Sequence, residues 1–196
     1  MTSCKSASRL LNEVRACTLC AAKLPFGPRP VLQVHARATI LIAGQAPGSK
    51  VHASGVPFQD ASGDRLRDWM GVDEETFYDP TRVAILPMGF CYPGTGKSGD
   101  NAPRPECAAA WRARLLAVLV NVKLTLVIGQ YAQDWHFGAR QKATLTETVQ
   151  AWRTYWPTSL PLPHPSPRNN IWLKRNAWFQ TEVLPQLRRR VRDLAA

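Results

Sequence analysis

The sequence predicts a single α/β domain in which helices cover both faces of a central, mainly parallel four-stranded sheet. Short apolar runs of strand length alternate along the chain with longer segments of helical periodicity. The 196 residues, 45% of them hydrophobic, suffice for one core, and no internal repeat divides them. We therefore expect one three-layer α/β/α domain over residues 1–196, with flexible tails at residues 1–7 and 193–196.

Four apolar runs have the length and composition of buried strands. They lie at residues 38–43, 83–86, 124–128 and 158–162. In the first two runs the apolar residues are nearly continuous rather than alternating, which is typical of strands covered on both faces. Gly44 and Gly129 follow the first and third runs and mark the turns that end them.

Helical patterns separate these strands, and helices are expected at residues 8–17, 64–70, 105–122 and 170–187. The second helix has Ser62 or Asp64 near its N-cap, and the third begins at Pro105, a favoured first residue. Pro185 is expected to interrupt the last helix. The proline-rich residues 24–32 are expected to cross the surface.

Composition narrows the class of protein. The formal charge of +11, from 25 Lys and Arg against 14 Asp and Glu, suits a polyanionic partner such as nucleic acid, and it equally suits a merely solvated basic surface. No run approaches the roughly 18 apolar residues that span a membrane. The polar N-terminus lacks a signal-peptide core. We therefore expect a cytoplasmic protein without membrane contact.

Two loops carry the residues best suited to chemistry. Gly44-Gln45-Ala46-Pro47-Gly48 follows the first strand, and His164-Pro165-Ser166-Pro167 follows the fourth. The carboxyl ends of parallel strands share one edge of a sheet, so both loops are expected at the same rim, where ligands bind in such folds. Neither the Gly44 loop nor residues 94–98 matches the spacing of a nucleotide-binding P-loop.

In order, separation and strand context, these two loops resemble the two active-site motifs of the uracil-DNA glycosylase superfamily, especially its families 4 and 5. The resemblance spans roughly residues 8–190 and includes Phe58, Gly63 and Leu66 between the motifs. It implies a single α/β domain that removes uracil from DNA in base excision repair. It also implies action on a base rotated out of the helix. No lysine is placed for Schiff-base lyase chemistry, so we expect a monofunctional enzyme, and we expect it to act as a monomer.

The resemblance further implies roles for particular residues. Phe58 would stack on the flipped base, His164 would stabilise the departing base, and Asp60 with Gln45 would handle the attacking water. Asp60 is as readily a turn residue that caps the following helix. Gly44, Ala46, Met88 and Asn169 are expected around the base. Pro87 stands where family 4 reads uracil with an asparagine, so other deaminated bases such as hypoxanthine or xanthine remain candidate substrates.

Five cysteines in a cytoplasmic chain, an odd number, do not suggest a disulfide framework. Cys17 and Cys20 form a close pair, and Cys91 and Cys107 form a wider one. Four thiolates can bind zinc or an iron–sulfur cluster. The four positions resemble the [4Fe–4S] ligands of family 4, which favours the cluster over zinc or free thiols.

DNA containing uracil or another deaminated base is the expected partner. Contacts to DNA are expected from Ser49, Lys50, Ser166, Arg168, Lys174 and Arg175. Two alternatives remain at this point. The chain would be a non-catalytic binder of damaged or single-stranded DNA on the same fold, or an iron–sulfur or zinc protein unrelated to DNA.

Overall fold

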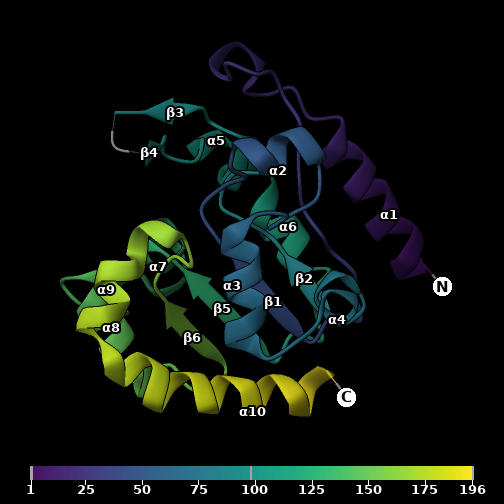
Figure 1. Cartoon of the computed structure of the whole chain (residues 1–196). Helices are drawn as coiled ribbons and strands as arrows, with labels where there is room; N and C mark the ends of the chain where they lie inside the picture. The colour runs from purple at the N-terminus through teal and green to yellow at the C-terminus, as the bar shows by residue number, and fades with distance from the viewer. Residues whose placement is uncertain (1, 98, 196) are drawn as a thin grey trace.

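The computed structural model describes residues 2–97 and 99–195, and for residues 2–6 it describes the backbone alone. Its centre is a sheet of four strands: β1 (Ile40–Ala43), β2 (Val83–Ile85), β5 (Leu124–Ile128) and β6 (Ser159–Leu162). The strands stand in the order β2-β1-β5-β6, and every neighbouring pair in this sheet is parallel. Each strand lies within its predicted run (Figure 1).

Helices cover both faces of this sheet. Ile40 and Ile42 of β1 pack with α3 (Ala61–Met70) and α10 (Leu184–Ala195). Leu41, between them, packs on the opposite face with α1 (Thr2–Arg15) and α6 (Ala113–Leu116). Successive side chains of a strand point to opposite faces, so a strand buried on both sides needs an unbroken apolar run. The predicted three-layer α/β/α architecture is confirmed.

The remaining elements are short. The other helices are α2 (Ser49–Ser54), α4 (Glu74–Tyr78), α5 (Pro105–Cys107), α7 (Gln130–Phe137), α8 (Leu145–Gln150) and α9 (Asn170–Arg175). Single 3₁₀ turns lie at Ala21–Lys23, Gly138–Arg140, Trp152–Thr154 and Pro167–Asn169, and π-helical turns at Ala108–Arg112 and Phe179–Val183. An antiparallel hairpin pairs β3 (Thr95–Gly96) with β4 (Gly99–Asp100) and projects at the upper left of Figure 1.

The four predicted helices all differ from the observed ones at one end or both, and the last two differ most. The chain is helical from Pro105 to Leu116 and continues in turns, rather than in helix, to residue 122. The last helical region breaks at Asn176 and not at Pro185. Pro185 follows a π-helical turn in which the Leu184 N–H bonds to the Phe179 carbonyl, so the ladder has already shifted where the proline lacks its donor.

Both ends of the described chain are helical. Helix α1 begins at Thr2 and α10 continues to Ala195, and the flexibility expected of residues 1–7 and 193–196 stays a prediction. Residues 1 and 196 lie outside the described part of the chain. The proline-rich segment runs beside the edge strand β2, where the Gln33 and Ile85 backbones exchange hydrogen bonds of 2.9 and 2.7 Å.

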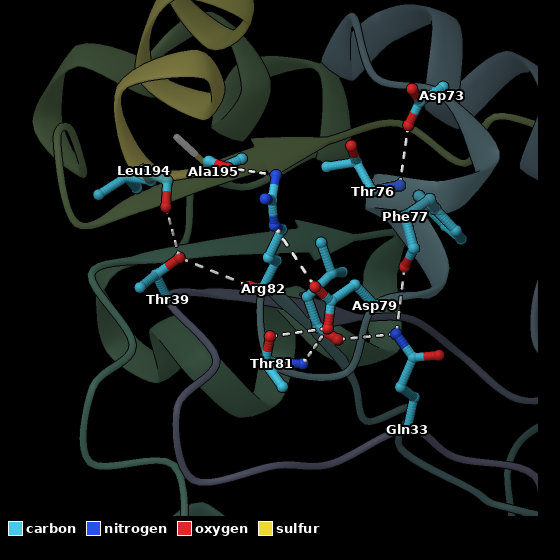
Figure 2. A network of polar contacts seen from close by, with 11 residues as sticks. Gln33, Thr39, Asp73, Thr76, Phe77, Asp79, Thr81, Arg82, Leu194 and Ala195 are labelled. Atoms are coloured by element: carbon cyan, nitrogen blue, oxygen red, sulfur yellow. Dashed lines mark hydrogen bonds and ion pairs between the residues drawn. The ribbon is translucent and has the colours of Figure 1, made fainter.

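A polar network closes the amino-terminal edge of the sheet (Figure 2). Thr39 Oγ1 donates to the Leu194 carbonyl at 2.9 Å, and Arg82 Nη1 donates to the Ala195 carbonyl at 2.6 Å. Gln33 Nε2 donates to the Phe77 and Val83 carbonyls at 3.1 and 2.8 Å. The end of α10 is therefore fixed to the residues that precede β1 and β2, away from the carboxyl edge.

Among the described residues, no helix combines the length and the hydropathy that crossing a membrane requires.

Candidate active site

A cavity of about 360 Å³ opens at the carboxyl edge of the sheet. The loop after β1 and the loop after β6 both line it, as do the segment before α3 and the β3–β4 hairpin. The predicted site residues that line it are Gly44, Gln45, Ala46, Ser49, Lys50, Phe58, Asp60, His164, Ser166 and Arg168. Two loops that are distant in the sequence thus meet at one cavity.

His164 presents a neutral imidazole to this cavity. Burial lowers the pKa of His164, and the nearby carboxylates of Asp60 and Asp100 offset part of this effect. The Ser166 backbone N–H donates to His164 Nδ1 at 3.2 Å, so the proton of the neutral ring is on Nε2. His164 can therefore donate a hydrogen bond from Nε2 without carrying a charge.

Residues outside the cavity brace the His164 loop. Asn169 Nδ2 donates to the His164 carbonyl at 2.7 Å. Arg65 of α3 donates to the Ser166 carbonyl at 3.0 Å and to Asn170 Oδ1 at 2.8 Å. Asn169, expected at the base, is therefore a brace of the loop and does not line the cavity. Arg65 was not predicted, because an arginine inside a helical pattern gives no sign of its distant partner.

Phe58 lies in the cavity with a constrained backbone. Its φ of 56° is the only positive φ of a non-glycine residue in the described chain. Gly63 makes this possible, since a Cβ there would overlap the Phe58 carbonyl oxygen. The ring packs edge-on against Phe77 at 6.1 Å between centroids, and a Cβ on Gly44 would lie 3.7 Å from its Cζ. Strain of this kind is characteristic of functional loops.

Asp60 has a structural task as well as a place in the cavity. Its Oδ1 accepts from the backbone N–H groups of Ser62 and Gly63 at 2.9 and 3.0 Å, which makes Asp60 the N-cap of α3. The N-cap prediction at Ser62 or Asp64 is therefore wrong, and the alternative in which Asp60 caps the following helix is confirmed. Oδ2 of Asp60 has no partner among the described residues and remains for a ligand.

The Gly44 loop turns its carbonyls inward. The Gly44 carbonyl accepts from the Met88 N–H at 2.8 Å, and the Gln45 carbonyl accepts from the Gly89 N–H at 2.9 Å. Within the described chain, the N–H groups of Gln45, Ala46 and Gly48 make no hydrogen bond. Such free amides at a cavity are suited to a negatively charged or carbonyl ligand. The Gln45 side chain donates to the Asn101 carbonyl at 3.1 Å.

Met88 was expected near the base and does not line the cavity. It is buried in an apolar cluster with Ala43, Val127 and Phe137, and only its backbone supports the Gly44 loop. Pro87 lines the cavity instead, directly after β2. The side chains of the residues that follow β2 alternate in direction, and the sequence alone did not show which of them points into the cavity.

The basic residues divide into two groups. Lys50 and Arg168 line the cavity together with Ser49 and Ser166. Lys174 and Arg175 are exposed on α9 and lie outside the cavity lining. The backbone N–H of Arg168 donates to Ser166 Oγ at 3.2 Å, which fixes the start of the 3₁₀ turn that carries it.

The β3–β4 hairpin contributes a carboxylate that sequence reasoning missed. Asp100 lines the cavity, and a Cβ placed on Gly48 would lie 3.5 Å from Asp100 Oδ2. A Cβ on Gly99 would lie 2.6 Å from Arg168 Nη1, so the hairpin packs closely on the His164 loop. The sequence signal available was only its position between Cys91 and Cys107, which shows no catalytic pattern.

The four predicted cysteine ligands line a second, much smaller cavity. Burial raises the pKa of Cys107 to about 12, and it also raises the pKa values of Cys20 and Cys91. The Phe90 N–H donates to Cys107 Sγ at 3.3 Å, and Trp111 Nε1 donates to Cys17 Sγ at 3.2 Å. Over the described residues, however, no three candidate ligands are assembled in an arrangement ready for a metal ion.

Comparison with protein families gives one result that bears on the first cavity. The family model of the uracil DNA glycosylase superfamily matches residues 32–188. This range includes the loops after β1 and β6, Phe58, Asp60 and the whole central sheet.

Proposed function

The chain belongs to the uracil-DNA glycosylase superfamily, and we propose that it is a monofunctional glycosylase that hydrolyses the bond between uracil and deoxyribose in DNA. The observation that carries the proposal is one cavity lined by Phe58, Asp60 and His164 together. Superfamily membership supports a DNA partner and a role in DNA repair. The residues of the cavity support the particular reaction.

The proposed chemistry follows from these groups. The everted base stacks on Phe58, which contributes about 1–3 kcal/mol. As the glycosidic bond breaks, negative charge develops on the base, and the His164 Nε2–H donates to a base oxygen. Because the imidazole is neutral, this donation stabilises the anion without protonating it. The free Oδ2 of Asp60 orients the attacking water and accepts its proton.

The substrate range rests on the base-reading groups. Within families 4 and 5, to which we assign the chain, the asparagine position of family 4 is taken by Pro87. A proline side chain offers no hydrogen bond, so the free amides of the Gly44 loop are the remaining base-reading groups nearby. Backbone donors recognise a carbonyl oxygen, which uracil, hypoxanthine and xanthine all carry. We therefore propose that uracil is the main substrate and that these deaminated purines are accepted more weakly.

A [4Fe–4S] cluster held by Cys17, Cys20, Cys91 and Cys107 is part of the proposal. The donor set fits, since four thiols line one cavity and two of them already accept N–H···S hydrogen bonds. Raised thiol pKa values mean that ligation must displace protons. The cluster would be structural, tying the segment after α1 to the loop that carries β3 and β4. No step of the reaction involves it.

The proposed DNA-binding face surrounds the mouth of the cavity. Lys50, Arg168, Ser49 and Ser166 contact phosphates beside the everted nucleotide, and Lys174 and Arg175 extend this basic surface along α9. We propose that a single copy of the chain suffices, because the residues assigned to the base, the water and the phosphates all come from one chain.

A panel of oligonucleotides tests the proposal. Purified protein is incubated in excess with strands containing uracil, hypoxanthine, xanthine or mismatched thymine, and released base is measured by chromatography. Uracil release with an intact strand, cleaved only after alkali treatment, supports a monofunctional glycosylase. Tight binding with no base release from any strand would favour the non-catalytic module instead. Cleavage without alkali would contradict monofunctional chemistry.

A further inference from the structure

We infer that Asp100 is a second catalytic carboxylate, which stabilises the positive charge that develops on the deoxyribose. The inference rests on the proposed function and concerns the same cavity. Asp100 is the last residue of β4, and the hairpin carries it over the loop after β1. Its role would be separate from that of Asp60, which serves the water.

The position of Asp100 within the cavity supports this division. The base end is marked by Phe58, whose ring lies close to Gly44. The phosphate end is marked by Lys50 and Arg168. Asp100 Oδ2 lies beside Gly48, and its neighbour Gly99 abuts Arg168. Because the Asp100 charge also acts on the His164 imidazole, Asp100 adjoins both the phosphate end and the group assigned to the base, and the sugar of an everted nucleotide must pass between the two.

The hydrogen bonding of Asp60 and Asp100 also supports separate roles for the two carboxylates. Oδ1 of Asp60 is committed to two backbone N–H groups at the start of α3. Among the described residues, no side chain or backbone group bonds to the carboxylate of Asp100. An acidic side chain without a structural partner, carried by a close-packed hairpin into a basic site, has no evident task in stability. Its charge remains available to the substrate.

The reaction balances with both groups present. The C1′–N bond breaks and its electron pair leaves with the base, which His164 stabilises. The sugar carries transient positive charge, and Asp100 opposes it. The water oxygen then bonds to C1′, and one water proton passes to Asp60. Asp100 keeps its charge throughout and exchanges no atom.

The proposed role of Asp100 has a measurable consequence, because the same negative charge should weaken DNA binding. The charged groups lining the cavity are Lys50, Asp60, Asp100 and Arg168, beside the neutral, titratable His164. A carboxylate on the phosphate side repels DNA in the ground state and attracts the sugar only in the transition state. Such a group strengthens binding of the transition state at the expense of the substrate. Neutralising it should therefore slow base release and tighten DNA binding together.

The test compares Asp100→Asn with Glu75→Gln, a matched neutralisation of an exposed carboxylate on α4. Single-turnover uracil release and DNA affinity are measured for both and for the wild type. We expect Asp100→Asn to lower the rate constant on the order of 100-fold, as loss of a preorganised charge does, and to lower the Kd for DNA several-fold. Glu75→Gln should match the wild type in both.

Two outcomes would overturn the inference while leaving the proposed function intact. A rate within about threefold of Glu75→Gln would show that the sugar does not need the Asp100 charge. Slower release with weaker DNA binding would indicate that Asp100 merely supports the hairpin. A wild type that releases no base from any strand would instead remove the proposed function, and the inference with it. Thermal unfolding of each variant establishes that the folded protein is compared.

Discussion

At the scale of single residues, a buried arginine holds in place the segment after β2 that lines the cavity. Arg112 is fully buried, and its Nη1 donates to the carbonyls of Leu86 and Pro87 at 2.7 and 2.8 Å. Its Nη2 lies 2.8 Å from His136 Nε2, and its guanidinium stacks on Trp135. No described carboxylate pairs with it, and burial lowers the pKa of Arg112 to about 10. Neutral acceptors alone therefore hold this cation, and with it the segment after β2.

His136 makes this arrangement sensitive to acid. Burial and the Arg112 charge lower the pKa of His136 from 6.5 to about 3. The unfolded chain binds this proton at higher pH than the folded chain does, so stability falls as pH decreases through that interval. The full loss corresponds to roughly 4–5 kcal/mol. His136→Gln, which keeps an acceptor for Arg112, should unfold in urea with a weaker dependence on pH between about 7 and 4.

His35→Gln is the matched control, since the His35 imidazole accepts from the Arg37 backbone N–H and is not among the contacts of Arg112. It should retain the acid sensitivity of the wild type. Equal pH dependence in the two variants would contradict the assignment of a neutral buried His136.

The site was only partly predictable from the sequence, because the sheet places some of its residues and the folding of loops places the others. His164 and the Gly44 loop directly follow strands, so their convergence follows from the parallel sheet, whereas Phe58 was placed by the family resemblance. Asp100 depends on how a hairpin folds back over the sheet, and no periodicity encodes that. Pro87 lines the cavity, and its neighbour Met88 points into the core. The sequence pattern does not resolve which of the two residues faces the cavity.

At the scale of elements, side-chain competition decides where helices end. The Asn176 side chain donates to the Trp172 carbonyl at 2.8 Å and accepts from Trp178 Nε1 at 3.1 Å. It therefore competes with the Asn176 backbone N–H, which reaches the same carbonyl at 3.0 Å, at the end of α9. Pro185 is tolerated because a π-helical turn precedes it. Strands could be located closely because they are buried on both faces. Helix ends could not, because they depend on individual side-chain partners.

The amino-terminal network in Figure 2 gives an element-scale prediction. Thr39→Val removes the hydroxyl that donates to the Leu194 carbonyl but keeps the shape of the side chain. We expect the free energy of unfolding to fall by about 1 kcal/mol, the usual contribution of such a bond, with no change in the rate of base release. Urea unfolding and single-turnover kinetics provide the two measurements.

Thr181→Val serves as its control, because the exposed Thr181 hydroxyl makes only weak contacts of 3.4 and 3.5 Å within its own helix. Its unfolding free energy should stay close to that of the wild type. A change in base release by Thr39→Val would contradict the separation between the two edges of the sheet.

At the scale of the whole molecule, the effect of the +11 charge on DNA binding depends on where the basic residues lie. Lys50 and Arg168 lie at the cavity, whereas Arg189 is exposed on α10, below the sheet in Figure 1. Arg168→Ala should weaken DNA binding and reduce the slope of log K against log salt by about 1, since one phosphate contact is lost. Arg189→Ala should leave the slope unchanged. Equal slopes for the two variants would contradict the proposed binding face.

The central claim is that the loops after β1 and β6 form one pocket in which His164 stabilises a departing base. Single-turnover release of free uracil by His164→Ala, compared with the wild type at equal DNA occupancy, tests it most directly. We expect the rate constant to fall about 10²- to 10³-fold, the usual effect of removing a preorganised donor, while the Kd for DNA stays within about threefold. Undiminished release by His164→Ala would contradict the claim.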